Sequence, residues 1–173
     1  AFSLFANSSS AQTGCWKQVT AGQNFSLGIK NDGTLWAWGL NASGQLGDGT
    51  KVDKISPTQI GTANDWKLLA TGFAHSLAIK VDGTLWAWGD NNFGQLGIGN
   101  NNDRTSPVKI GTANDWKFIS AGDNHTVAIK NDGTLWAWGS NENGQLGDGS
   151  ASNRNAPIQI GATSDWLRIS ASG

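Results

Sequence analysis

Short runs of alternating apolar and polar residues recur along the chain, separated by stretches rich in glycine and asparagine. In the run 25–30 (FSLGIK), Leu27 and Ile29 fall on one face of an extended segment, because successive side chains of a strand point to opposite faces. The run 35–39 (LWAWG) likewise places its two tryptophans on one face. Helical spacing of apolar residues is absent from the pattern. The pattern therefore predicts an all-β chain.

The polar stretches between these runs carry turn signals. An Asp-Gly pair within 31–34 (NDGT) stands between two alternating runs and indicates a tight hairpin. The stretch 44–49 (GQLGDG) is a glycine-rich turn that needs positive φ angles. Pro57 fits the start of an edge strand, because proline cannot donate to a sheet ladder. Four strands are predicted here, over residues 16–20, 25–30, 35–39 and 57–60.

The whole arrangement repeats at a fixed distance of 50 residues. The stretch 131–147 (NDGTLWAWGSNENGQLG) has counterparts at 31–47 and 81–97, without insertion or deletion. A period of this size indicates an array in which each unit is one supersecondary element packed on its neighbours. The chain divides into an N-terminal arm or signal remnant, three repeats and the start of a fourth: 1–15, 16–65, 66–115, 116–165 and 166–173.

Strands that are apolar on both faces fit a propeller blade better than a sandwich, in which one face of each sheet stays polar. The chain has 10 tryptophans, and their flat rings suit the contact between neighbouring blades. We predict a partial β-propeller with about three four-stranded antiparallel blades plus the first strand of a fourth. Trp38, Trp88 and Trp138 are expected at equivalent buried positions.

The repeated motifs resemble those of RCC1 repeats. The resemblance rests on the pattern W-K-x-x-x-x-G, then D-G-T-L-W-A-W-G-x-N, then G-Q-L-G-x-G and a proline, and it covers residues 16–173. The resemblance implies that each repeat forms one blade of a seven-bladed propeller. It also implies a protein that acts by binding other proteins, as a nucleotide-exchange factor for a small GTPase or as a bacterial enzyme inhibitor. Only three repeats are complete here, and Ser172 stands where the earlier repeats have Gly22, Gly72 and Gly122.

An arc of three blades leaves two outer blade faces open, a larger apolar surface than soluble monomers usually expose. We expect more chain, another copy or a partner to cover them. The apolar arm 1–6 and the predicted strand 166–171 are candidates for pairing with another segment or copy. The expected assembly residues are Phe2, Leu4, Phe5, Trp166, Leu167 and Ile169.

Candidate chemistry is scarce. His75 and His125 share one repeat position, where Phe25 stands in the first repeat, and both are interpreted as structural residues at a turn. The repeated aspartates of the hairpins are interpreted as turn residues. The GQLGDG turn lacks the spacing of a phosphate-binding loop or of a calcium-binding β-solenoid. We therefore predict no catalytic residues, no metal site and no cofactor, and the chain is interpreted as a non-enzyme.

The loops are more informative, because three zones diverge between repeats while the scaffold positions stay fixed. The divergent zones are 21–25, 40–43 and 48–56, with their counterparts 50 and 100 residues later. Binding residues usually lie on such loops, although drift of exposed positions would produce the same divergence. The predicted partner contacts are Leu40, Lys51, Lys54, Phe73, Asp90, Phe93, Arg104, Glu142 and Arg154.

Charge and composition narrow the remaining options. The net charge of −1 offers no electrostatic footprint for nucleic acid, and no apolar run reaches the ~18 residues of a membrane span. The single cysteine, Cys15, excludes an internal disulfide framework. Residues 1–11 resemble the end of a secretory signal or a flexible arm, so we expect a secreted or extracellular protein and otherwise a cytoplasmic one. The acceptor pattern for N-glycosylation occurs at Asn7, Asn24, Asn41 and Asn124.

The leading hypothesis is a non-catalytic module that binds a protein partner through its loops. The alternative is a secreted structural subunit that self-assembles through its open blade faces and strand exchange, as a ring or a filament. A weaker third option is glycan binding by tryptophan and asparagine in the repeated loops.

Overall fold

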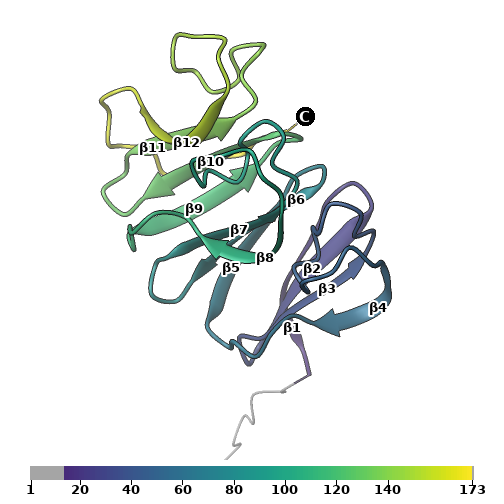
Figure 1. The fold of residues 1–173 in the computed structure, drawn as a ribbon. Coiled ribbons are helices and arrows are strands. Elements are labelled where there is room, and N and C mark those ends of the chain that lie inside the picture. Colours follow the sequence, from purple (N-terminus) through teal and green to yellow (C-terminus); the bar gives the residue numbers. More distant parts are fainter. Residues whose placement is uncertain (1–13, 173) are drawn as a thin grey trace, which may run out of the picture.

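A computed structural model describes residues 14–172 of the 173-residue chain. In that part of the chain, twelve strands form three four-stranded antiparallel sheets in the orders β1-β2-β3-β4, β5-β6-β7-β8 and β12-β11-β10-β9. The sheets follow one another as an arc of stacked blades (Figure 1). The predicted fold class, an all-β partial propeller, is thereby confirmed. The strands are β1 (Trp16–Ala21), β2 (Phe25–Lys30), β3 (Leu35–Gly39), β4 (Lys54–Gln59), β5 (Trp66–Thr71), β6 (His75–Lys80), β7 (Leu85–Gly89), β8 (Arg104–Lys109), β9 (Trp116–Ala121), β10 (His125–Lys130), β11 (Leu135–Gly139) and β12 (Arg154–Ile160).

The predicted hairpin joins β2 to β3. Phe25 pairs with Gly39 and Ile29 with Leu35, so the turn comprises residues 30–34. Asp32 fixes this turn, because its Oδ1 accepts hydrogen bonds from the Thr34 backbone N at 3.0 Å and from Thr34 Oγ1 at 2.7 Å. These two bonds, the side-chain bond first, lower the pKa of Asp32. The interpretation of the repeated aspartates as turn residues agrees with this geometry.

The fourth strand begins earlier than the sequence pattern predicts. β4 begins at Lys54 rather than at Pro57, and it pairs with β3 through Ala37↔Thr58 and Gly39↔Lys54. Between these two pairs, one residue of β3 thus stands opposite three residues of β4, and the irregular register includes Pro57. Proline has no backbone N–H, so the edge strand accommodates it where the ladder is broken.

Each sheet has two different faces. The trailing face carries Leu27, Ile29, Leu35 and Ala37 and their counterparts, and in the first sheet it packs on the next sheet along the chain. The leading face carries the tryptophans of β1 and β3 and their counterparts, and in the second and third sheets it meets the preceding sheet. Two apolar clusters result, one at each junction between sheets, and they form the core.

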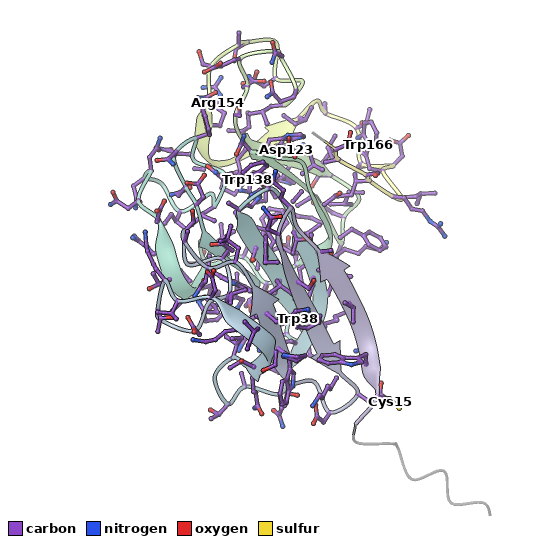
Figure 2. All side chains as sticks on the ribbon, turned by 90° about the vertical axis from the view of Figure 1, so that its right-hand side faces the viewer. Cys15, Trp38, Asp123, Trp138, Arg154 and Trp166 are labelled. Carbon is purple, nitrogen blue, oxygen red and sulfur yellow. The ribbon has the colours of Figure 1, made fainter. Side chains whose placement is uncertain are left out.

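Residues 166–171 lie beside the third sheet without forming a ladder with any described strand. The backbone N of Trp166 donates to the Gly133 carbonyl at 3.2 Å, and the backbone N of Ala171 donates to Ser120 Oγ at 2.9 Å. The predicted strand therefore occupies the place of a fourth opening strand but pairs with none of the described strands. Its Trp166 lies on the side of the molecule away from Arg154 (Figure 2).

The described residues include no helix that is long and apolar enough to span a membrane.

Candidate functional site

Each junction between sheets is held by one backbone carbonyl of the glycine-rich turn. The Gln45 carbonyl accepts hydrogen bonds from Trp88 Nε1 at 2.9 Å and from Ser76 Oγ at 2.7 Å. The Gln95 carbonyl does the same with Trp138 Nε1 and Thr126 Oγ1, both at 2.9 Å. Because these bonds are buried, they fix the turn of one blade onto the face of the next.

The glycines of this turn allow the close approach. A Cβ on Gly47 would lie 2.7 Å from Trp88 Nε1, and its φ of +79° is a conformation that other residues rarely adopt. Gly97 stands in the same relation to Trp138, with a φ of +70°. The predicted positive φ angles of the GQLGDG turn are confirmed, and a packing requirement adds to them.

A buried asparagine organises each long loop. The Oδ1 of Asn41 accepts from the Leu46 backbone N at 3.0 Å, and its Nδ2 donates to the carbonyls of Thr50 and Val52, both at 3.1 Å. Asn91 and Asn141 repeat these contacts in the other two loops. The sequence signal was an asparagine recurring every 50 residues inside a zone interpreted as divergent.

This packing overturns the glycosylation prediction at Asn41. The side chain is fully buried, and its amide nitrogen is engaged by the loop, so the fold has no room for a glycan there. Asn24 is exposed and Asn124 half-buried, and both remain predicted acceptors. Asn7 lies outside the described residues.

All three divergent zones of each repeat lie at the same end of its sheet. In the first sheet, Ala21 pairs with Ser26, Phe25 with Gly39, and Gly39 with Lys54, which brings the loops 22–24 and 40–53 together. We call this side of the array, with the counterpart loops of the other repeats, the loop end. The opposite side, the hairpin end, consists of residues 31–34 and 60–65 and their counterparts. It has nearly the same sequence in every repeat.

Apolar side chains at the loop end are partly open to solvent. Leu40 is 38% exposed and Phe73 is 43% exposed. Phe93 is half-buried and lies between two hollows. One, of about 390 Å³, is shared with Asn153 and Arg154. The other, of about 450 Å³, is shared with Glu142.

Charges at the loop end are mostly engaged within the loops. Lys54 Nζ lies 2.9 Å from Asp48, and Arg154 Nη2 lies 2.7 Å from Asp148. Lys51 Nζ lies 3.4 Å from Asp103, which belongs to the long loop of the second repeat. Burial acts to raise the pKa of Asp48, but hydrogen bonds from Lys54, Thr50 and Asn41 outweigh it and lower that pKa to about 2. Asp90 behaves in the opposite way, because burial and the neighbouring Asp103 raise its pKa.

The predicted partner contacts therefore share one end of the array but form no single pocket. Phe93, Glu142 and Arg154 lie around the second and third sheets. Lys51, Lys54 and Leu40 belong to the long loop of the first sheet and the start of β4. Arg154 and Asp123 both belong to the loop end, Arg154 at the start of β12 and Asp123 in the loop between β9 and β10. The remaining predicted contacts are Phe73, Asp90 and Arg104.

The two histidines occupy counterpart positions, His75 at the second junction and His125 on the outer, trailing face of the third sheet. His75 is fully buried, and its Nε2 lies 3.3 Å from Thr126 Oγ1 in the third sheet. Burial lowers the pKa of His75 to about 3, so the ring is neutral at physiological pH. His125 is half-buried, and burial also lowers its pKa. A neutral, enclosed ring fits the structural role that the sequence suggested.

The assembly residues divide between described and undescribed parts of the chain. Phe2, Leu4 and Phe5 lie outside the described residues. Trp166 is 42% and Leu167 75% exposed, whereas Ile169 is half-buried. Within residues 14–172, no group of three or more His, Cys, Asp or Glu side chains is arranged to hold a metal ion.

Comparison with known proteins agrees with the blade architecture. The Regulator of chromosome condensation (RCC1) repeat matches residues 32–79, 82–129 and 132–173. A second description of this repeat matches 16–45, 66–95 and 116–145. The chain belongs to the RCC1 repeat family. One curated relative, the ultraviolet-B receptor UVR8 of Arabidopsis thaliana, is 37% identical over 43 residues, which is 25% of this chain and 10% of UVR8.

Solved structures extend the similarity over most of the chain. Prp20p from Saccharomyces cerevisiae, described with its binding properties to Gsp1p and histones, is 26% identical, with a TM-score of 0.80 over 91% of this chain and 42% of Prp20p. Yeast RCC1 (Prp20) bound to Kap60 is 27% identical, with a TM-score of 0.75 over 86% of this chain and 37% of that one. Human WBSCR16, at 23% identity and a TM-score of 0.53, shares the fold. The chain thus spans less than half the length of the Prp20 chains that it matches.

Proposed function

We propose that this chain is a non-catalytic protein-binding module, in which RCC1 blades form a rigid support and the loop end contacts the partner. One observation carries the proposal: the loop zones that diverge between repeats gather at one end of the array, whereas the hairpin end keeps nearly one sequence. Loops on a rigid scaffold are the usual place for binding residues. The relative Prp20p, described by its binding to Gsp1p and histones, supports the same class of function.

The contacts of the titratable groups fit binding better than catalysis. A catalytic acid or base needs a pKa near the working pH and access to the substrate. The carboxylates of Asp48 and Asp148 are instead held in ion pairs and by hydrogen bonds from the loop, and their pKa values are lowered. His75 is neutral and enclosed. The exposed apolar residues Leu40 and Phe73 are the kind of side chain that a partner would bury.

Photo-crosslinking in cells tests this proposal. A photoreactive phenylalanine at position 93 would report on the loop end, and the same residue at Val81, 67% exposed beside the hairpin, would report on the hairpin end. We expect crosslinks to a discrete partner from position 93 and few from position 81. Phe93→Ala should then weaken the purified complex about tenfold, since loss of an interface aromatic costs ~1.4 kcal/mol or more. Equal crosslinking at both ends would contradict the proposal.

A second candidate, head-to-tail assembly of copies, is supported by the two outer faces. On the leading face of the first sheet, Trp16 is 40%, Val19 51% and Ile55 103% exposed. At the other end of the array, Gln145 is exposed, and no described residue donates to its carbonyl, whereas Gln45 and Gln95 are buried in junctions. The carbonyl of Gln145 on one copy would accept from Trp38 Nε1 of the next. Such a heterologous contact gives a ring or a filament.

Light scattering over a range of protein concentrations tests the assembly. Growth of the mean mass with concentration, abolished by deletion of 166–173 or by Val19→Glu, would support it. An intact chain and both variants that are equally monomeric and stable would contradict it. Deletion of 1–11 addresses the predicted role of the arm in the same measurement.

A further inference from the structure

The long loop of the second repeat differs from its two counterparts at one position that matters electrostatically. The first and third loops carry an acid six residues before a cation, and the two are paired: Asp48 with Lys54 at 2.9 Å and Asp148 with Arg154 at 2.7 Å. The second loop has Ile98 in place of the acid but keeps the cation, Arg104. Within residues 14–172, Arg104 makes no ion pair, and its Nη1 donates to the carbonyl of Asp103 at 3.2 Å.

Ile98 and Arg104 line a cavity of about 490 Å³. The cavity lies between β8 with its flanking loops and the leading face of the third sheet, and its size is typical of ligand clefts. Its wall is mainly apolar and aromatic, and the residues that form this part are Ile98, Val108, Ile110, Trp116, Trp136 and Pro157.

The polar side chains in the wall are nearly all donors. Lys130 lies 4.9 Å from the Trp116 ring and 4.7 Å from the Trp136 ring, and Asp115 holds its Nζ at 3.2 Å. The other two cations of the wall, Arg104 and Lys109, form no ion pair with any described residue, and no Asp or Glu lines the cavity.

The wall also holds a buried donor without an acceptor. Trp116 is 4% exposed, and its Nε1 donates to no described residue. The site therefore combines an apolar interior with positive charge and spare donors at its edge, which is complementary to an anion on an apolar body.

We propose that this cavity binds a peptide segment of the partner in which a carboxylate stands beside a bulky apolar side chain. The apolar side chain enters between Ile98, Trp136 and Pro157, and the carboxylate meets the Arg104 guanidinium. Arginine suits this role because its planar fork can hold both carboxylate oxygens. This inference rests on the proposed function, since it gives the protein-binding module a specific ligand chemistry.

The first and third loops explain why the second is distinct. An acid at position 98 would pair with Arg104, as Asp48 pairs with Lys54, and would add a negative charge to the apolar wall. With isoleucine at position 98, the Arg104 guanidinium stays available to an anion and the wall keeps its apolar character.

Nuclear magnetic resonance of the tryptophan indole N–H groups tests the proposal in the full chain. The probes are the blocked peptide acetyl-Gly-Asp-Leu-Phe-Gly-amide and the same peptide with asparagine in place of aspartate. We expect the Trp136 signal, assigned by Trp136→Phe, to shift with the aspartate peptide, and the asparagine peptide to bind at least tenfold more weakly.

Matched variants then distinguish binding at this site from nonspecific binding of the peptide. Ile98→Asp and Arg104→Gln should each weaken binding of the aspartate peptide at least tenfold, whereas Lys67→Gln, which removes an exposed cation of β5 outside the cavity, should leave the affinity unchanged. Circular dichroism melting verifies that each variant is folded.

Three outcomes would overturn the proposal: no shift of the Trp136 signal, equal binding of both peptides, or full binding by folded Ile98→Asp. None of them bears on crosslinking at position 93, so failure of this site and failure of the protein-binding function remain distinguishable.

Discussion

Trp38 and Trp88 occupy the same position of the same repeat, yet their surroundings differ. Trp88 is fully buried, and its Nε1 donates to the Gln45 carbonyl of the preceding sheet. Trp38 is half-buried and has no such acceptor in the described residues, because its face of the first sheet meets no other sheet there. The prediction of equivalent burial is thus wrong for Trp38 and right for Trp88 and Trp138. A blade's strands come from its own repeat, but the environment of its tryptophans comes from its neighbour.

The same contrast extends to the opening strands. Trp16 is 40% exposed, whereas its counterparts Trp66 and Trp116 are both 4% exposed. Each contacts the first tryptophan of β3, β7 or β11 in the same edge-on way within its own sheet. The aromatic cluster is therefore a property of each blade, and the neighbour only excludes water from it.

The largest effect should come from removing the junction tryptophan. Trp88→Ala deletes a fully buried ring and its hydrogen bond, and we expect it to lower the free energy of unfolding by ~3–5 kcal/mol. Trp38→Ala removes the same ring from a half-open face and should cost only about 1–2 kcal/mol, since less area returns to water. Urea denaturation of both variants compares them. Equal losses would mean that the first and second sheets do not differ as described.

An intermediate effect is expected from His75, and it depends on pH. Its pKa is about 3 in the folded chain and ~6.5 when unfolded, so the unfolded state binds the proton first as the pH falls. Its contribution is full above ~6.5 and declines by ~1.4 kcal/mol per pH unit below it. His75→Phe, which introduces the residue found at Phe25, should flatten the stability curve between pH 6.5 and 5. Parallel curves for the two proteins would refute this assignment.

The smallest effect should separate two serines. Ser76→Ala removes a buried hydrogen bond to the Gln45 carbonyl and should cost ~1 kcal/mol, because Trp88 still donates to that oxygen. Ser26→Ala changes the corresponding position of the first sheet, where no acceptor is present among the described residues, and should cost less than about 0.5 kcal/mol. Thermal unfolding resolves the pair. A larger loss of stability for Ser26→Ala than for Ser76→Ala would contradict the difference between the outer face of the first sheet and the junction face of the second.

Local sequence determined the strands and hairpins of this protein. Alternation of apolar residues and the Asp-Gly turn predicted β2 and β3 with their observed bounds, because strand pairing across a tight turn depends only on neighbouring residues. The 50-residue period likewise predicted the array. The same local reasoning placed the start of β4 at Pro57 instead of Lys54, because the irregular register depends on pairing with β3.

Only the tertiary structure decided what each repeated residue does. Trp88 reaches an acceptor 43 residues away and Ser76 one 31 residues away, so neither contact can be deduced from a single repeat. Asn41 matches the acceptor pattern for glycosylation, but the fold buries its side chain. The role of Ile98 likewise becomes visible only from Arg104 and Trp136, which line the same cavity. Hydrogen bonds between the two strands of a hairpin follow from the spacing of that hairpin's own residues. Burial and charge pairing depend on contacts with the neighbouring blade, and these contacts form only when the blades are stacked.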